Sequence, residues 1–320
     1  MSQAVFALLR RLHAGGLHPR EELVRALGVS QGELDDCIAA LRAQGVAIES
    51  TPAGCALRRR VDLLDATALS ERLHERDTDL RVTLYDECDS TNARLLAEPE
   101  VHARVICCEL QTAGRGRRGR VWRSGLGDAL TFSLGWRIDR PVHALGGLSL
   151  AAAVTCAGTL EALGIGDVQV KWPNDLMRSG GKLGGILIEV ARSTPTYCDV
   201  VIGVGLNVRF DAHVRAGIDQ PVADLADAQT MPSRTLLLAQ LLHDLASGLQ
   251  RYAAHGFPDF KREWLRLHAF QDRPVRLAMN EYDSIEGTAR DIADDGALIV
   301  ATAAGVRHFH AGEITLRGVA

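Results

Sequence analysis

Residues 111–120, Gln-Thr-Ala-Gly-Arg-Gly-Arg-Arg-Gly-Arg, combine two residue types that together can bind an anion. Arginine presents a planar, permanently charged group of donors to carboxylate or phosphate oxygens. Glycine allows backbone N–H groups to approach a ligand closely, and it disfavours a regular helix. We therefore predict a mobile loop that folds over an anionic ligand.

Other interpretations of this stretch compete with an anion-binding loop. Gly114, Gly116 and Gly119 have the spacing of a dinucleotide-binding motif, but that motif must lead directly into a helix. The strand-like residues 129–136 follow instead, which disfavours a dinucleotide site. A nucleic-acid-binding patch and a solvated surface loop remain open alternatives.

A second polar cluster lies further along the chain, where Lys171 and Lys182 flank the turn Pro173-Asn174-Asp175 and a glycine-rich hairpin. A cation held on a rigid hairpin can stabilise negative charge that develops on an oxyanion or a phosphate. Asn174 and Asp175 carry oxygen atoms that could bind Mg²⁺ together with water and phosphate. The same residues are common in plain turns, and two solvent-exposed lysines would fit the spacing equally well.

The composition narrows the class of protein. The 320 residues are 47% hydrophobic and 24% charged, which is ordinary for a soluble chain of two or three domains. With a net charge of −4, any affinity for nucleic acid must come from a local patch. Seven cysteines without a C-x-x-C pair favour reduced thiols and a cytoplasmic location.

Membrane and secretory segments are not expected. Residues 1–15 lack the apolar core of a secretory signal. The longest uncharged stretch, 141–160, consists largely of small and weakly polar residues and contains His143. We therefore predict a buried helix at this stretch and no membrane span.

Residues 1–62 are predicted to form a winged helix-turn-helix, with a small helical docking domain as the alternative. Ser30 followed by Glu33 is the pattern of a capping box at the start of the third helix. Three helices with a tight turn before the third, followed by a hairpin, are typical of DNA-binding modules. The expected helices span 3–14, 19–27 and 30–44, and the expected hairpin spans 46–57.

The charges of this module are unusual for a DNA-binding protein. The third helix should present cations or amides to DNA, but it carries Glu33, Asp35 and Asp36 near its start. Phosphate contacts would then have to come from arginines elsewhere in the module. The candidates are Arg20, Arg25, Arg42 and the cluster at 58–60.

The rest of the chain predicts an α/β (α+β) protein with a separate all-β end. After an amphipathic helix in 63–79, alternating strand and helix patterns run to residue 270. From 271 only short strands with glycine turns follow, which predicts a β-barrel of SH3 size. The expected domains are 1–62, 63–270 and 271–320. Expected strands are 82–85, 105–111, 129–136, 168–172, 182–189 and 200–208, and expected helices are 89–98, 144–163, 235–252 and 260–267.

Three motifs, in this order and spacing, resemble those of the biotin protein ligases. They are Gly-Arg-Gly-Arg-Arg-Gly-Arg at 114–120, Lys-Trp-Pro-Asn-Asp-Leu at 171–176 and Lys-Leu-Gly-Gly-Ile-Leu-Ile-Glu at 182–189. The helix-turn-helix in front is similar to the BirA type, which is both a ligase and the repressor of the biotin operon. The resemblance implies a mixed sheet like that of class II aminoacyl-tRNA synthetases and lipoate ligases.

The resemblance also implies a two-step reaction. The carboxylate of biotin attacks the α-phosphate of Mg·ATP and gives biotinyl-5′-AMP and pyrophosphate. A lysine amine of the biotin carboxyl carrier protein then attacks this mixed anhydride. Bringing two anions together requires cations, and a labile anhydride requires a closed, dry site.

Site residues follow from the same resemblance. Lys182, Arg117 and Arg115 are the expected catalytic residues, because they would lie where negative charge grows. Asp175 is the expected Mg²⁺ ligand. The expected biotin-binding residues are Ser90, Thr91, Asn92, Gln111, Arg115, Gly116, Arg117, Trp122 and Lys182, and the expected ATP-binding residues are Arg117, Arg120, Lys171, Asn174, Asn207 and Arg317.

The expected partners are the carrier protein, biotin-operon operator DNA and a second copy of the chain in a ligand-promoted homodimer. Two other functions remain open. One is a DNA-binding regulator whose ligase core only senses biotinyl-AMP, and the other is a lipoate or octanoate ligase on the same core. The arginine-rich loop disfavours the lipoate ligase.

Overall fold

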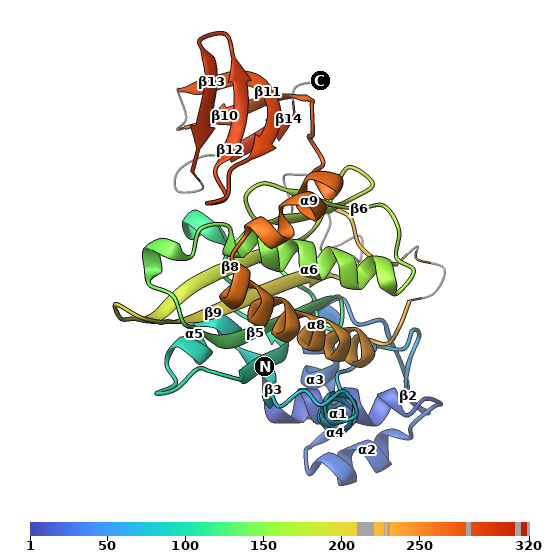
Figure 1. Cartoon of the computed structure of the whole chain (residues 1–320). Helices are drawn as coiled ribbons and strands as arrows, with labels where there is room; N and C mark the ends of the chain where they lie inside the picture. The colour runs from blue at the N-terminus through green and yellow to red at the C-terminus, as the bar shows by residue number, and fades with distance from the viewer. Residues whose placement is uncertain (210–220, 227, 229–230, 280–282, 311–314, 319–320) are drawn as a thin grey trace.

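A computed structural model describes residues 1–209, 221–226, 228, 231–279, 283–310 and 315–318, without the side chains of Thr315 and Arg317. Three parts follow one another along the long axis of the molecule (Figure 1). The N-terminal helices lie at one end, a seven-stranded sheet with its helices lies in the middle, and a five-stranded sheet lies at the other end (Figure 1).

The N-terminal part has the predicted winged helix-turn-helix arrangement. Ser30 and Glu33 form the expected capping box at the start of the third helix, and Gly28 ends the second helix in the left-handed conformation. The buried apolar faces of the helices form one core, which also includes Leu110 and Leu126 from the central part. The elements are α1 (Gln3–His13), α2 (Arg20–Leu27), α3 (Gln31–Ala43), β1 (Ile48–Thr51) and β2 (Gly54–Leu57).

A buried ion pair anchors the connection between the N-terminal and central parts. Arg234 has an exposed fraction of 0%, and its guanidinium lies 2.7 Å from the carboxylate of Glu109. It also donates to the backbone oxygens of Asp62 and Ala129. The connecting residues therefore pack as part of the protein interior, and they lead into the predicted amphipathic helix, α4 (Ala66–His74).

The central sheet is mixed, as predicted. Its strand order is β3-β4-β5-β9-β8-β7-β6, in which β3 and β4 are parallel and the other neighbours are antiparallel. The first strand extends from Arg81 to Cys88, beyond the predicted 82–85, because it pairs with β4 along nearly its whole length. The strands are β3 (Arg81–Cys88), β4 (Arg104–Gln111), β5 (Ala129–Ile138), β6 (Val168–Lys171), β7 (Asp175–Arg178), β8 (Gly181–Ser193) and β9 (Cys198–Asn207).

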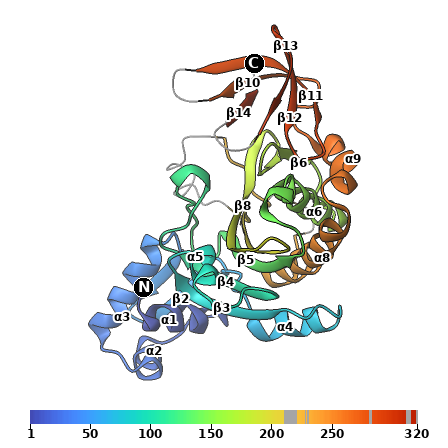
Figure 2. The same cartoon turned by 60° about the vertical axis from the view of Figure 1, so that its left-hand side comes forward.

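Helices cover both faces of this sheet. On one face α6, α8 and α9 pack against one another and against the large core (Figure 2). On the other face α5 contacts β4, β5 and β9. The predicted buried helix is confirmed, and within the described residues no helix is both long and apolar enough to span a membrane. The helices are α5 (Thr91–Leu96), α6 (Leu148–Ala162), α8 (Arg234–His255) and α9 (Pro258–Leu267).

The C-terminal part is an antiparallel sheet with the order β13-β12-β11-β10-β14. It contacts the central part where Trp172 Nε1 donates a hydrogen bond to the carbonyl of Gly296 at 3.1 Å. Residues 313–314 of the last predicted strand lie outside the described residues, and the three domain boundaries stay a prediction. The strands are β10 (Pro274–Ala278), β11 (Ser284–Ile292), β12 (Leu298–Thr302), β13 (Gly305–Phe309) and β14 (Thr315–Gly318).

Candidate active site

The start of α5 forms one wall of the candidate site. Ser90 caps the helix, and its hydroxyl accepts a hydrogen bond from a backbone N–H of the first turn. The Oε1 atom of Gln111, at the end of β4, accepts from the backbone N–H of Thr91 at 2.8 Å and from its hydroxyl at 3.2 Å. The Ser133 hydroxyl of β5 lies 2.8 Å from the Thr91 hydroxyl. These side chains are therefore oriented before any ligand arrives.

Asn92 is the most tightly held residue of this wall. Its Oδ1 accepts from the Ser133 hydroxyl at 2.5 Å. Its Nδ2 donates to the carboxylate of Glu189 at 2.8 Å and to the carbonyl of Leu187 at 3.2 Å. A Cβ atom on Gly203 would lie 2.1 Å from Oδ1 of Asn92, so glycine is required beneath this amide.

The arginine-rich stretch forms a tight, hairpin-like loop at the mouth of the site. The backbone N–H of Gly116 donates to the carbonyl of Arg120 at 2.7 Å, and that of Trp122 donates to the carbonyl of Gly114 at 2.9 Å. Arg118 has a φ of 59°, a conformation that ordinary residues rarely adopt. The predicted loop is confirmed as a loop, and its mobility stays a prediction.

Trp122 closes the side of the loop that faces the sheet. A Cβ atom on Gly205 would lie 2.5 Å from its indole ring, so the ring packs directly on the backbone of β9. The indole Nε1 is buried and has no hydrogen-bond partner among the described residues. An apolar cover of this kind keeps water away from the neighbouring polar groups.

Basic side chains form the opposite wall. The ammonium group of Lys182 lies 2.7 Å from Oδ1 of Asp175. Arg117 donates to Oδ1 of Asn174 at 3.2 Å, and Nδ2 of Asn174 donates to the carbonyl of Ile186 at 2.7 Å. The predicted turn is therefore tied both to the arginine loop and to β8, and Asp175 is already the first residue of β7.

Two further features fix the basic wall. Asn207 donates through Nδ2 to the carbonyls of Lys182 and Ala223, which holds β9 against β8. Burial lowers the pKa of Arg117, because the guanidinium loses water, although the nearby Asp175 acts in the opposite direction. A partly desolvated cation interacts more strongly with an incoming anion than an exposed one.

Between these walls lies a cavity of about 600 Å³, within the usual size range of small-molecule sites. Every predicted site residue lines it except Arg317, whose side chain lies outside the described residues. Among the described residues, its lining contains seven cations and one carboxylate, Asp175. The cations are Arg115, Arg117, Arg118, Arg120, Arg123, Lys171 and Lys182.

A metal site is not preformed in the described part of the chain. It contains no group of three or more His, Cys, Asp or Glu side chains that could hold an ion. Oδ1 of Asp175 forms an ion pair with Lys182. Asn174 is hydrogen-bonded to Arg117 and to the carbonyl of Ile186. One carboxylate can assist Mg²⁺ only when phosphates and water supply the other ligands. The assignment of Asp175 therefore stays a prediction.

Sequence reasoning missed Ser133, Gly203, Gly205 and Glu189. Three of these are ordinary residues within buried strands, and only pairing between distant strands brings them to the site. Glu189 had a visible sign, since it ends the apolar run Ile-Leu-Ile-Glu within a strand. A carboxylate at the end of such a run needs a partner, and here the partners are Asn92 and Arg115.

The fold is that of a known class of enzymes. Residues 87–207 match the Biotin/lipoate A/B protein ligase family, and residues 272–317 match the Biotin protein ligase C terminal domain. Biotin protein ligase from Aquifex aeolicus, in complex with biotin and ATP, has a similar structure, with a TM-score of 0.64 and 24% sequence identity. That similarity covers 75% of this chain and 99% of the other.

Two relatives of known sequence narrow the assignment. The bifunctional ligase/repressor BirA of Salmonella typhimurium is 35% identical over 313 residues, which cover 97% of this chain and 96% of the relative. The biotin–[acetyl-CoA-carboxylase] ligase of Mycobacterium tuberculosis is 35% identical over 218 residues, 65% of this chain and 79% of the relative. The chain therefore belongs to the biotin protein ligase family. Its similarity to the ligase/repressor relative includes the N-terminal helices, which confirms the resemblance to the BirA type.

Proposed function

We propose that this chain joins biotin to a lysine of the biotin carboxyl carrier protein of acetyl-CoA carboxylase, with ATP as the energy source. The observation that supports this most directly is the arrangement of the cavity. A wall of fixed hydrogen-bonding groups faces a wall of cations, beneath one glycine-rich loop. A substrate with a polar ring and a carboxylate tail fits the first wall, and a nucleotide fits the second.

In the first step a carboxylate oxygen of biotin forms a bond to the α-phosphorus of Mg·ATP, and the bond to the β-phosphate breaks as pyrophosphate leaves. Lys182 neutralises charge that grows between the two anions. Arg117 and Arg120 hold phosphate oxygens, and Lys171, Asn174, Asn207 and Arg317 are proposed to hold the rest of the nucleotide. Mg²⁺ enters as part of the Mg·ATP substrate.

In the second step the neutral amine of the acceptor lysine attacks the carbonyl carbon of biotinyl-5′-AMP. A carbon–nitrogen bond forms, the carbon–oxygen bond to AMP breaks, and the amine loses a proton. The intermediate must survive until the acceptor arrives, which requires exclusion of water. We assign this role to the backbone of Arg115, Gly116 and Arg117 together with the ring of Trp122.

The ATP–pyrophosphate exchange reaction tests this proposal. Biotin should drive the exchange, and lipoate or octanoate at the same concentration should not. Exchange that depends on lipoate would overturn the assignment in favour of the alternative ligase. Transfer of biotin to a purified carrier domain then separates a ligase from a regulator that only senses biotinyl-AMP.

A second function, biotin-responsive repression, is supported by the winged helix-turn-helix. Arg20, the first residue of α2, connects three elements of this module. It donates to Gln31 and Asp35 of α3 and to Ser50 of β1. Glu33 is used by its own helix, since its carboxylate accepts from the backbone N–H of Ser30 at 2.6 Å. Asp35 is thus paired with a cation, and the Glu33 carboxylate is held at the start of its own helix, so both acidic groups have partners within the module.

We propose that the chain binds biotin-operon DNA as a ligand-promoted homodimer in the cytoplasm. All seven cysteines are free and buried, as expected in a reducing compartment. Gel shifts with the operator, with and without biotin and ATP, test the DNA binding. Sedimentation at the same protein concentrations measures the molecular mass and so tests the dimer. Absence of any ligand-dependent shift at low salt would overturn the repressor function and leave the ligase proposal intact.

A further inference from the structure

Glu189 lies on β8, opposite the start of α5, and its two carboxylate oxygens have different partners. Oε2 accepts the hydrogen bond from Nδ2 of Asn92 at 2.8 Å. Oε1 forms an ion pair with the guanidinium of Arg115. The Glu189 side chain has an exposed fraction of 24%, so solvent screens these contacts less than those of a surface pair. One carboxylate therefore joins the wall at α5 to the arginine loop.

The contact with Glu189 decides which atom of Asn92 a ligand can reach. Leu187 O and the Glu189 carboxylate can only accept hydrogen bonds, so both N–H groups of the Asn92 amide must face them. The carbonyl oxygen of the amide accepts from Ser133 and keeps a second lone pair. Toward the cavity Asn92 is therefore an acceptor, which suits a ligand that donates an N–H.

The contact also decides what the side chain of Arg115 can do. Arg115 lines the cavity, whereas Glu189 is not among the residues that line it. The guanidinium of Arg115 is thus paired with a carboxylate that does not line the cavity. Lys182 differs, because both Lys182 and its partner Asp175 line the cavity and can exchange partners with an incoming anion.

We propose that Glu189 is a positioning residue that fixes Asn92 as an acceptor for the ring N–H of the substrate and anchors Arg115 so that the loop covers the cavity. This inference rests on the proposed function, because the ureido ring of biotin supplies that N–H. The guanidinium of Arg115 then serves as an anchor, and only the backbone of Arg115 contacts the substrate. Ring recognition and loop closure thus share one carboxylate.

A double-mutant cycle tests the shared role. Glu189→Ala, which frees Asn92 as well as Arg115, should raise the KM for biotin roughly tenfold in the exchange assay, as expected for the loss of a charged hydrogen bond. Arg115→Ala leaves Asn92 held and should raise the KM by less. The kcat should change by less than about threefold, since neither side chain touches the reacting atoms. The KM of the double variant should be no higher than that of Glu189→Ala, because Glu189→Ala already removes the contact with Arg115.

The opposite result has a distinct form. If the guanidinium of Arg115 binds the substrate's carboxylate or phosphate, Arg115→Ala lowers kcat while Glu189→Ala does not, and the two effects add. That pattern would overturn the anchoring role.

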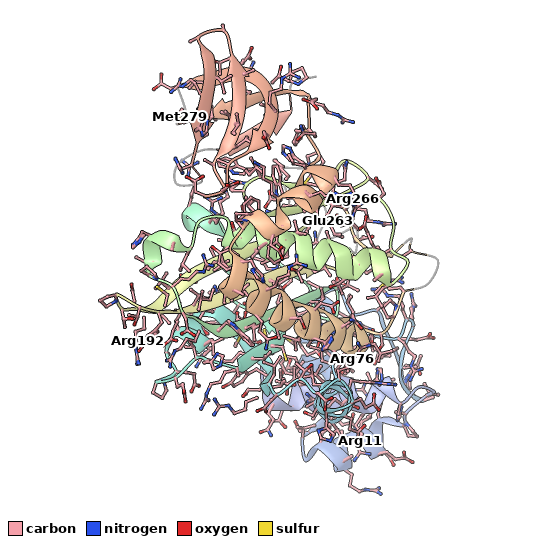
Figure 3. The ribbon with its side chains drawn as sticks, in the orientation of Figure 1. Arg11, Arg76, Arg192, Glu263, Arg266 and Met279 are labelled. Atoms are coloured by element: carbon pink, nitrogen blue, oxygen red, sulfur yellow. The ribbon has the colours of Figure 1, made fainter. Side chains whose placement is uncertain are left out.

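A conservative variant separates the two oxygens of Glu189. Glu189→Gln keeps an acceptor for Asn92 and removes the charge that holds Arg115. Its KM for biotin should be close to that of the unchanged chain. It should still release biotinyl-AMP into solution faster than the unchanged chain. Glu263→Gln is the matched control, because Glu263 pairs with Arg266 on α9, away from the cavity (Figure 3). Equal defects in Glu189→Gln and Glu189→Ala would overturn the separate role at Asn92.

A measurement without substrate distinguishes failure of this inference from failure of the proposed function. The backbone N–H of Gly116 is hydrogen-bonded to Arg120, so its hydrogen exchange reports whether the loop is anchored. Exchange at this amide should be about tenfold faster in both Glu189 variants than in the unchanged chain and the Glu263 control. Unchanged exchange would overturn the anchor, whereas faster exchange in a chain that does not activate biotin would overturn only the proposed function.

Discussion

The cavity and the N-terminal helices both contain arginines, but they place them in opposite electrostatic settings. In the part of the chain that the structure describes, seven cations and one carboxylate line the cavity. In contrast, α2 and α3 together carry five carboxylates and three arginines. The first surface concentrates positive charge where a ligand can reach it, and the second has an excess of negative charge.

The partners of the N-terminal arginines explain this difference. Arg10 pairs with Asp86, Arg20 with Asp35 and Arg59 with Asp128. Arg42 donates to a backbone carbonyl, and Arg58 lies 4.0 Å from Glu49. Most arginines that we expected to bind DNA phosphates therefore already have partners within the chain. Arg11, Arg25 and Arg60 are exposed and have no such partner among the described residues, and Arg11 can be followed in Figure 3.

The groups that a guanidinium contacts therefore indicate whether it can bind a ligand, and the number of arginines in a sequence does not. Cations that bind ligands face a cavity, and cations that stabilise the fold face their own carboxylates. Two single variants and one double variant test this distinction.

The largest effect is expected at Arg234, a purely structural cation. Arg234→Ala leaves Glu109 buried without its partner and should lower the free energy of unfolding by about 3–5 kcal/mol. Thermal or urea unfolding measures this loss. The matched control is Arg266→Ala, which breaks half-exposed pairs with Glu161 of α6 and Glu263 of α9 and should cost less than about 1 kcal/mol. Equal losses in the two variants would contradict the distinction.

A smaller but functionally decisive effect is expected at Lys182. Lys182→Ala should lower the rate of biotin-dependent ATP–pyrophosphate exchange by about two to three orders of magnitude, because charge growing at the α-phosphate loses its cation. Biotin binding, measured by calorimetry, should change far less, and the free energy of unfolding should fall by less than in Arg234→Ala, because the Lys182–Asp175 pair is less buried than Arg234–Glu109. Near-normal exchange would show that Lys182 does not stabilise the transition state.

The smallest effect is expected on α3. Replacing Asp35 and Asp36 with lysine should strengthen non-specific DNA binding by about tenfold at low salt, and the salt dependence should steepen as more phosphates are neutralised. Gel shifts at several salt concentrations measure both quantities. Glu71→Lys on α4, outside the helix-turn-helix, provides the control for added charge. No gain over this control would mean that α3 does not approach DNA.

Local features of the fold were predictable from the sequence, and distant pairings were not. The capping box of Ser30 and Glu33, the buried helix α6 and the arginine loop each depend on neighbouring residues, so their patterns are visible in the chain. The partners of Arg10 and Arg59 are brought close only by the packing of the N-terminal helices on the central sheet.

The candidate site shows the same division. Motifs within single segments identified Gln111, Asn174 and Lys182, and all three line the cavity. Glu189 escaped attention because its two partners come from α5 and from the loop, which lie far from it along the chain. Resemblance to a family predicted more residues of the site than residue patterns alone, but it assigned no role to the Glu189 carboxylate.

The core of the N-terminal helices includes Leu110 and Leu126, which stand at either root of the arginine loop and have exposed fractions of 5% and 3%. The hydrophobic interior is therefore continuous across the point where the chain would be divided by sequence. A chain that lacks residues 1–62 would have two uncovered leucines beside the arginine-rich loop. For protein engineering and for evolution alike, removing the N-terminal helices would thus require polar substitutions at these two positions.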